Sequence, residues 1–507
     1  MTGQKSIKSA LISVYHKDKL DTIVSKLDEL KVHLFSTGGT AQFIKGMGIE
    51  VTEVESLTGY PGILGGRVKT LHPKVFGGIL GRRDIDNDIR EMEQYEIPGI
   101  DLVVVDLYPF EATVAAGGTP DEIIEKIDIG GISLIRAAAK NHRDVLIVPS
   151  RDHYAALIEL LDKKKGMSDQ MDRLQFAQAA FAVSSHYDTS IYHYFASAEP
   201  EYLKSSSHEY RSLRYGENPH QKGRFYGRLD DLFDQIHGKE ISYNNLLDID
   251  AGIRLIDEFD ETSFGILKHN NACGFASRES LSQAWKDALA GDPVSAFGGI
   301  LITNRPIDVD TADEINKIFF EVVIAPAYSD GALTVLRQKK NRIILVRKDC
   351  AMPGYQFKTL LNGLIWQNQD KRRETGNDLK FVTQEKPSSQ QVKDLLFANI
   401  LVKHTKSNAI VLVKNNQLIS SGTGQTSRVD ALKQAIDKAV HFGFDLEGVV
   451  MASDAFFPFK DSIEIAFAAG VRAVIQPGGS IRDQESIDFC NEKRIPMVFT
   501  GIRHFKH

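Results

Sequence analysis

Cysteine is scarce in this chain. Cys273, Cys350 and Cys490 make up an odd number of widely separated residues, and no C-x-x-C pair occurs. This spacing supplies neither a disulfide framework nor a zinc knuckle. It favours a protein of a reducing compartment.

Long apolar runs and an excess of positive charge are also missing. The first eight residues lack the apolar stretch of a signal peptide, and no later run approaches membrane-spanning length. The net charge is -6 and the isoelectric point is about 6.2, so no basic field indicates a nucleic-acid partner. We therefore expect a cytoplasmic protein that binds neither membranes nor nucleic acids.

What the chain does contain is ordinary globular composition at considerable length. Its 507 residues predict two to four domains, and 42% hydrophobic with 25% charged residues is typical of a globular protein. In the first part of the chain, apolar runs alternate with segments of helical spacing. The strands expected there cover residues 10–14, 32–35, 101–105 and 145–148. Such alternation predicts a parallel sheet with helices on both faces.

A glycine-rich segment follows the second of these strands. Ser36-Thr37-Gly38-Gly39-Thr40 precedes a helix expected from Ala41 to Lys45, so backbone N–H groups and hydroxyls there would suit a phosphate. A plain strand-to-helix turn is the alternative. The charged loop at residues 65–73, which carries Arg67, Lys69 and His72 between glycines, favours the phosphate site.

The most informative tetrad is Lys268-His269-Asn270-Asn271. It follows the apolar run Phe264–Leu267, which we expect to be a buried strand. A lysine and a histidine at a strand end are poorly suited to packing, but they suit charge and proton handling at the mouth of an open α/β sheet. A structural histidine remains the alternative for this position alone.

A polar segment from residue 197 to residue 208 breaks the helical periodicity and predicts a linker. We therefore expect an N-terminal domain at 1–199 and a C-terminal domain at 200–507. Within the latter, residues 264–300 and 408–457 show the same succession of strands, polar loop, alanine-containing helix and Ser-Ala-Phe or Asp-Ala-Phe string. This echo predicts a tandem duplication, with subdomains at about 200–365 and 366–507.

Four strings identify a family that the chain resembles. They are GGRVKTLHP at 65–73, RYGENPHQ at 214–221, KHNNACG at 268–274 and QPGGS at 476–480. Together they resemble the bifunctional AICAR transformylase/IMP cyclohydrolase family over nearly the whole chain. The resemblance implies an α/β fold, with an N-terminal methylglyoxal-synthase-like open parallel sheet and two C-terminal cytidine-deaminase-like layers.

The family's two reactions complete IMP synthesis. The formyl group of 10-formyltetrahydrofolate, a co-substrate, passes to AICAR, and formyl-AICAR then closes its ring with loss of water. The resemblance also implies a homodimer whose transformylase sites share residues across the interface. Because the chain has no cysteine–histidine ligand set, we expect both reactions to run without a metal.

By resemblance, ring closure is catalysed by Lys69, Tyr108, Asp128 and Lys140. The reaction needs a base near the amide, a cation near the oxyanion and a donor to the leaving oxygen. Asp128 paired with Lys140 suits the first task. However, a straight helix over residues 131–140 would separate its ends by ~14 Å. The residues implied to bind this substrate are Ser13, Lys17, Thr37, Gly38, Gly39, Thr40, Arg67, Thr70, Gly130 and Gly131.

For formyl transfer, we assign His269 as the proton carrier, because the amine of AICAR is a weak nucleophile that must lose a proton as it attacks. Lys268 would stabilise the oxyanion, and Asn408 would orient the imidazole or the amine. The resemblance assigns nucleotide contacts to Arg214, Tyr215, Asn245, Gly298, Glu321, Phe456 and Arg503. It assigns folate contacts to Ser427, Arg428 and Asp461. Phe457, by contrast, is expected in the core.

Several positions depart from the family pattern. Tyr15 and His16 replace the middle of the family's Ser-Val-Ser-Asp-Lys string, and Asp106 replaces a frequent asparagine, which would add a negative charge near the nucleotide. Ala272 replaces a common proline. Glu321 stands where some members have aspartate.

Rival functions differ in what they require. A zinc deaminase needs H-x-E with P-C-x-x-C, which the chain lacks, and Gly422-x-Gly424 lacks the third glycine of a dinucleotide motif. No P-loop string occurs. One alternative stays open: the N-terminal domain could be a phosphate-binding regulatory module, with catalysis confined to the rest of the chain.

Overall fold

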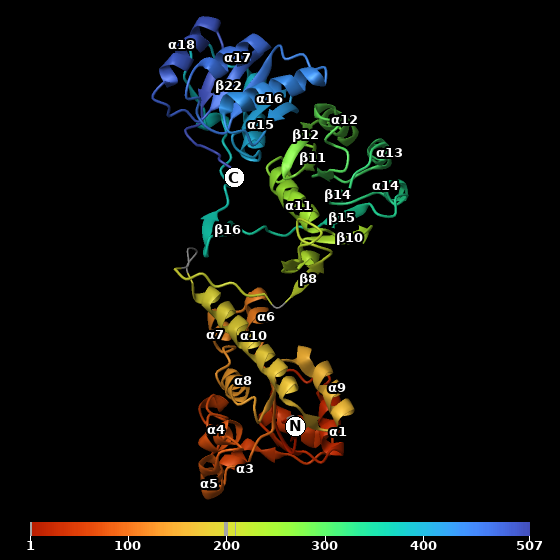
Figure 1. Ribbon diagram of the computed structural model, residues 1–507, viewed down its shortest axis with the longest axis vertical. Helices are drawn as coiled ribbons and strands as arrows, with labels where there is room; N and C mark the ends of the chain where they lie inside the picture. The colour runs from red at the N-terminus through yellow and green to blue at the C-terminus, as the bar shows by residue number, and fades with distance from the viewer. Residues whose placement is uncertain (1–2, 197–200, 208) are drawn as a thin grey trace. The chain divides into compact units, whose positions relative to one another are not determined.

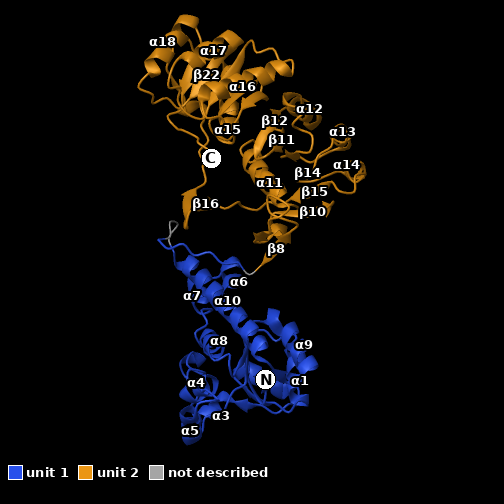
Figure 2. Cartoon of the chain, viewed as in Figure 1, with its two compact units in different colours: residues 1–208 blue, residues 209–507 orange. Residues whose placement is uncertain are grey.

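The computed structural model describes residues 3–196, 201–207 and 209–507. The chain divides into two compact units, Met1–His208 and Glu209–His507 (Figure 2), whereas the sequence predicted a boundary at 199/200. Residues 197–200 and 208 of the predicted linker lie outside the described residues.

The first unit is built on a five-stranded sheet of order β4-β3-β2-β5-β6, in which every pairing is parallel. The strands of this unit are β1 (Lys5–Ser6), β2 (Ser9–Val14), β3 (His33–Ser36), β4 (Thr52–Glu53), β5 (Leu102–Asp106), β6 (Leu146–Val148) and β7 (Met167–Ser168). Strands β2, β5 and β6 are almost entirely buried, as expected for a parallel sheet with both faces covered.

Helices cover this sheet (Figure 1). The helices of this unit are α1 (Leu20–Glu29), α2 (Gly38–Gly46), α3 (Val54–Thr58), η1 (Leu64–Gly66), α4 (Pro73–Leu80), α5 (Asp86–Gln94), α6 (Phe110–Ala115), α7 (Pro120–Ile124), α8 (Gly130–Lys140), η2 (Arg151–His153), α9 (Tyr154–Lys164) and α10 (Gln170–Phe195). Helix α2 begins at Gly38, three residues before the expected start. The two glycines therefore form the first turn of the helix and are not a loop before it.

The second unit contains a twelve-stranded sheet of order β10-β15-β14-β13-β11-β12-β20-β19-β21-β22-β23-β18. Its strands are β10 (Phe233–His237), β11 (Ser263–Lys268), β12 (Asn271–Ser277), β13 (Ile300–Thr303), β14 (Val322–Ala325), β15 (Ile343–Arg347), β18 (Lys380–Phe381), β19 (Ile410–Lys414), β20 (Gln417–Gly422), β21 (Val449–Ser453), β22 (Val471–Gln476) and β23 (Met497–Phe499). Two separate hairpins are β8 (Tyr210–Leu213) with β9 (Gly223–Tyr226), and β16 (Tyr355–Leu360) with β17 (Gly363–Asn368).

The order of this sheet contains the predicted duplication. In each half an antiparallel hairpin, β11–β12 or β19–β20, is followed by three parallel strands, and the two halves meet where Ala276 pairs with Gln417. The helices are α11 (Tyr243–Ile256), α12 (Leu281–Gly291), α13 (Val309–Ile315), α14 (Asp330–Leu336), η3 (Leu229–Asp231), η4 (Gly376–Asp378), α15 (Ser389–Lys403), α16 (Arg428–His441), α17 (Asp461–Ala469) and α18 (Asp483–Lys493).

One hydrophobic core crosses the junction of the halves. It contains Ile249 of α11, Leu395 of α15 and strand residues of both repeats, while separate cores lie under α12–α14 and α16–α18. Phe457 is fully buried in the last of these, so its predicted core position is confirmed. Each repeat therefore has its own outer helices, and the two share the core on the other face.

A helix approaches a strand closely in both repeats, at different positions along the strand. A Cβ added to Gly274 of β12 would lie 2.0 Å from the carbonyl oxygen of Ala288 in α12. At Gly422 of β20 the corresponding distance to Ala431 O in α16 is 1.7 Å. Backbone cannot yield to such a contact, so only glycine allows this packing.

We therefore expect Gly422→Ala to destabilise the second unit by at least 1–3 kcal/mol, roughly the cost of forcing extra volume into a packed core. Gly376→Ala is the matched control, because no atom lies within 4 Å of a Cβ at that position. Thermal unfolding of both variants checks the prediction. Equal midpoints for Gly422→Ala and the wild type would contradict it.

Candidate active sites

The first candidate site lies at the edge of the five-stranded sheet where β2, β3 and β5 end. Thr37 is the N-cap of α2, and its hydroxyl lies 3.4 Å from that of Ser13 at the end of β2. In the described chain, the N–H groups of Gly38 and Gly39 donate no hydrogen bond. The first turn of α2 thus presents free donors and the positive end of the helix dipole, which together suit a phosphate.

Lys17 completes this cradle from the loop after β2. Its ammonium donates to Thr40 Oγ1 at 3.0 Å, and that hydroxyl donates to the carbonyl of Val14 at 3.0 Å. Burial lowers the pKa of Lys17, and the nearby Asp106 charge opposes the shift. A partly desolvated ammonium of this kind binds an anion more strongly than one in bulk water.

Lys69 reaches the same cradle from the loop between η1 and α4. Its Nζ lies 3.0 Å from the position that a Cβ on Gly38 would occupy, and it forms a 2.7 Å ion pair with Glu55. Thr70 is buried against the start of α8, where a Cβ on Gly130 would lie 2.9 Å from its hydroxyl oxygen. Arg67 instead pairs with Glu125 at the surface. The loop at residues 65–73 therefore contacts the glycine-rich start of α2 through Lys69, whereas Arg67 of the same loop points to the surface.

Asp128 lies just before α8, and its surroundings suit a proton acceptor. Its carboxylate accepts from Gly131 N at 2.6 Å, and its own N–H donates to the hydroxyl of Tyr187 at 2.9 Å. Burial raises the pKa of Asp128, although hydrogen bonds from the backbone of Gly131 and Tyr108 oppose the shift. Burial, followed by the Asp128 charge, also raises the pKa of Tyr108, so its hydroxyl keeps its proton.

The expected pairing of Asp128 with Lys140 is wrong in this structure. Helix α8 runs unbroken from Gly130 to Lys140, so the two residues lie at opposite ends of the helix, on the order of 15 Å apart. Within residues 3–196, Lys140 forms no ion pair. The carboxylate of Asp128 instead accepts a hydrogen bond from Gly131 N in the first turn of α8, and Lys140 is the last residue of that helix.

Two departures from the family pattern contact each other. His16 Nδ1 lies 2.7 Å from Asp106 Oδ2, and the same oxygen accepts from His16 N at 2.9 Å. The ring of Tyr15 packs edge-on against that of Tyr108, with Lys126 Nζ 5.1 Å from the Tyr15 ring centroid. The negative charge expected of Asp106 therefore has a partner that the sequence did not reveal.

The second candidate site begins at a hairpin. Lys268 pairs with Asn271, and the two residues between them, His269 and Asn270, have φ angles of 52° and 66°. Both central residues are thus left-handed, as in a type I′ turn. The tetrad was expected as a loop leading to a helix, but it is a two-residue turn between antiparallel strands, with His269 exposed at its tip.

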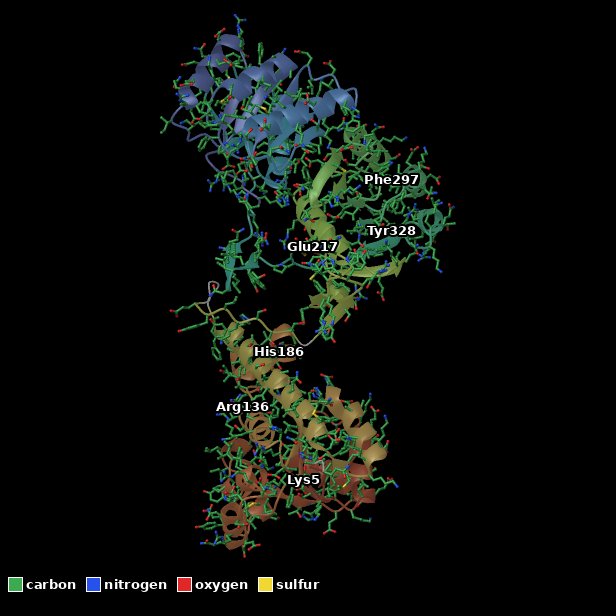
Figure 3. All side chains as sticks on the ribbon, viewed as in Figure 1. Lys5, Arg136, His186, Glu217, Phe297 and Tyr328 are labelled. Carbon is green, nitrogen blue, oxygen red and sulfur yellow. The ribbon has the colours of Figure 1, made fainter. Side chains whose placement is uncertain are left out.

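Lys268 points its ammonium at the next loop, where it donates to the carbonyl of Phe297 at 2.8 Å (Figure 3 labels Phe297). Gly298 follows with φ 75°, and its N–H donates to Phe319 O. Glu321, beside this loop, forms an ion pair with Lys239. Lys268, Gly298 and Glu321 are therefore gathered at one end of β11, β13 and β14.

Asn408 belongs to the other repeat, before β19. Its Nδ2 donates to Gln425 O at 2.9 Å, and its Oδ1 accepts from Arg428 at 3.1 Å. Arg428 also forms a 2.7 Å ion pair with the buried Asp454. The two repeats meet nearby, because Lys406 N donates to Asn271 Oδ1 at 2.9 Å. The loop of Asn408 is thus bound to the turn of His269.

The remaining predicted residues are more scattered. Arg214 stacks on Tyr215, with 5.4 Å from the guanidinium carbon to the ring centroid, and Asn245 lies in the first turn of α11. Asn244 joins these two segments by donating to the backbone oxygen of Glu217 at 3.2 Å. The other predicted contacts are Phe456 and Asp461, both exposed, Ser427 as the N-cap of α16, and the exposed Arg503, which stacks on Phe505.

Sequence analysis missed several partners of these residues. Asp248 binds the His269 turn, Asp454 binds Arg428, and Glu55 binds Lys69. Asp248 alone carried a signal, because it lies three residues after Asn245, a spacing that would place both residues on one face of a helix. The others are distant in sequence, so the sequence contained no sign of these contacts.

No group of three or more His, Cys, Asp or Glu side chains among the described residues has the geometry to hold a metal ion. None of the described helices is both long and apolar enough to cross a membrane.

Comparisons with known proteins decide the family. A family model described as AICARFT/IMPCHase bienzyme matches residues 138–438, more than half of the chain, and one described as MGS-like domain matches residues 19–133. The chain belongs to the AICARFT/IMPCHase bienzyme family. It is an AICAR transformylase and IMP cyclohydrolase of purine biosynthesis, so the hypothesis of a bifunctional enzyme is confirmed.

The sequences of known relatives match this chain over its full length or nearly so. The bifunctional purine biosynthesis protein PurH of Bacteroides thetaiotaomicron is 62% identical over 507 residues, which cover 100% of both chains. PurH of Acetivibrio thermocellus is 46% identical over 517 residues, covering 99% of this chain and 100% of its own. A crystal structure of ForH matches 38% of this chain and 100% of its own at 35% identity, with a TM-score of 0.33, too low to establish a shared fold.

Proposed function

We propose that each unit performs one of the two reactions, ring closure in residues 1–208 and formyl transfer in residues 209–507. One observation carries this division. Lys69, Tyr108 and Asp128 lie in the first unit around the start of α2 and α8, whereas Lys268 and His269 lie in the second at the end of β11. In this assignment, the two reactions share no residue.

For ring closure, the phosphate of formyl-AICAR binds the first turn of α2, with Ser13, Lys17 and Thr40 around it. Asp128 accepts the proton of the carboxamide nitrogen as that nitrogen attacks the formyl carbon, and its raised pKa favours this proton transfer near neutral pH. Lys69 stabilises the oxyanion, and Tyr108 donates to the oxygen that leaves as water. Lys140 joins this set by family resemblance alone.

We expect Asp128→Asn and Lys69→Ala each to slow ring closure by ~10²–10³ while formyl transfer continues, so that formyl-AICAR accumulates. Asparagine keeps an acceptor for Gly131 N, which separates lost basicity from lost structure. Because the pKa of Asp128 is raised, the wild-type rate should fall on its acid side at a pH above ~3.9, and Asp128→Asn should lack this limb.

The measurement is the ring-closure rate on purified formyl-AICAR against pH. Asp121→Asn, an exposed change in α7, is the control and should leave the rate unchanged. Ring closure at the wild-type rate in either test variant would remove that residue from the proposed mechanism.

For formyl transfer, His269 takes the proton of the AICAR amine as the amine attacks the formyl carbon of 10-formyltetrahydrofolate. Lys268 stabilises the tetrahedral oxyanion, and Asn408, held by Arg428 and Gln425, orients the reacting groups. We place the nucleotide along Arg214, Tyr215, Asn245, Gly298, Glu321, Phe456 and Arg503, and the folate along Ser427, Arg428 and Asp461. The exposure of His269 at the tip of its turn supports this role.

His269→Ala should abolish formyl transfer and leave ring closure intact. The wild-type transfer rate should fall on its acid side, because a protonated imidazole cannot take the amine proton. Lys268→Ala should slow transfer but keep this limb, because the lysine supplies charge and not the titrating base. Transfer rates against pH, with folding checked by circular dichroism, decide the matter; a folded His269→Ala enzyme with most of its activity would contradict the assignment.

We also propose a homodimer, and the hairpin β16–β17 supports it. Every residue of both strands is exposed, although they include Phe357, Leu364, Ile365 and Trp366. A two-stranded hairpin is at best marginally stable in water by itself, and apolar side chains on it favour a covering surface. The resemblance to a family of homodimers makes a second copy of this chain the occupant that we propose.

Phe357 and Trp366 lie opposite each other across the hairpin, so a positive charge at this pair should oppose burial. We expect the double variant Phe357→Lys/Trp366→Lys to sediment as a monomer and to lose formyl transfer, while ring closure by the first unit continues. Tyr95→Lys, at an exposed aromatic residue of the first unit, is the control. Sedimentation of the wild-type chain as an active monomer would refute the dimer.

The remaining proposals concern the metal requirement of the two reactions and the cellular compartment of the protein. We propose that neither reaction needs a metal, since the side chains assigned above supply the base, the cations and the proton donors. The three cysteines are unpaired, and Cys490 is buried. This supports a reducing compartment, and we propose the cytoplasm.

A further inference from the structure

The turn that carries His269 needs an outside constraint. Residues other than glycine seldom adopt positive φ, and His269 and Asn270 both do so in succession. Such a conformation persists only where its surroundings hold it. The residue that holds it is Asp248 of α11, whose Oδ1 accepts from Asn270 N at 2.6 Å. Turned by 180°, the amide of Asn270 also donates to Asp248 Oδ1 at 3.2 Å.

Helix α11 gives this carboxylate a fixed origin. The helix begins with a capping box between Ser242 and Asn245, and Ile249, Ile253 and Ile256 bury its inner face in the core shared by the two repeats. Asp248 lies one turn after Asn245, so the two share one face of the helix. The proposed nucleotide contact and the support of the turn therefore belong to a single rigid element.

The charges around Asp248 indicate more than a structural bond. Burial raises the pKa of Asp248, while the Asn270 N–H and the positive charges of His269 and Lys268 oppose the shift. The carboxylate thus lies within the electrostatic range of both cationic side chains of the turn.

We infer that Asp248 is a positioning residue for formyl transfer: its carboxylate holds the His269–Asn270 turn so that the imidazole faces the amine of a nucleotide bound along the same face of α11. Its negative charge also stabilises the imidazolium that forms when His269 takes the amine proton. This inference rests on the proposed role of His269.

Two substitutions separate shape from charge. Asp248→Asn keeps an acceptor of the same size for Asn270 N but removes the negative charge, and it should lower kcat for formyl transfer about tenfold. In this variant the acid limb of the formyl-transfer rate should move to lower pH, and the KM for AICAR should be nearly unchanged. Asp248→Ala removes both and should cost on the order of 10²-fold, as expected for a misplaced catalytic group.

Asp250→Asn is the matched control, because Asp250 lies on the same helix but pairs with Arg254 at the surface. Ring closure on formyl-AICAR and thermal unfolding should be unchanged in Asp248→Asn, which excludes a general loss of structure. If Asp248→Ala does not fold, the pH profile of Asp248→Asn decides.

The outcomes distinguish this inference from the proposal beneath it. A lowered kcat with a displaced acid limb in Asp248→Asn supports it. A wild-type rate and limb in Asp248→Asn, while His269→Ala is inactive, overturns the inference and leaves the role of His269 standing. Substantial formyl transfer by a folded His269→Ala enzyme overturns the proposed function itself.

Discussion

The larger unit depends on the junction between β12 and β20, where Ala276 pairs with Gln417. This pairing joins two repeats into one sheet and places a single core beneath α11 and α15. It also brings the hairpin of each repeat next to the other, so that Lys406 of one half can bind Asn271 of the other. The proposed formyl-transfer residues come from both halves, and their arrangement follows from this strand pairing.

Sequence periodicity predicted those parts of the fold that local patterns determine. Buried strands such as Leu102–Asp106 are continuous apolar runs, and the duplication repeats a recognisable order of elements. The turn at Lys268–Asn271 was not predicted as a hairpin, because neither central residue is the glycine that usually marks such a turn. Whether Asp128 can reach Lys140 depends on whether α8 is continuous between them, and the sequence alone did not show that it is. Contacts between distant segments, such as Lys69 with Glu55, left no trace in local sequence.

Several charged residues assigned to substrates form an ion pair with a residue of opposite charge. Lys69 pairs with Glu55, Lys239 with Glu321, and Arg428 with Asp454. These pairs differ in burial: Asp454 is inaccessible, whereas Lys239 and Glu321 are partly exposed. Arg428, which we place beside the folate, thus has a buried partner in Asp454 and also fixes the loop of Asn408. His16 and Asp106 extend the pattern, since two unusual residues compensate each other.

A sheet of twelve strands has two open edges, and an open edge is a template for uncontrolled association between molecules. Here the edge strands are poor templates. Strand β18 is only two residues long, and the pairing of β10 is irregular between Gln235 and His237. Short or irregular edge strands offer few aligned hydrogen-bonding groups to an incoming chain. The two ends of the sheet therefore offer few positions at which a further strand could pair.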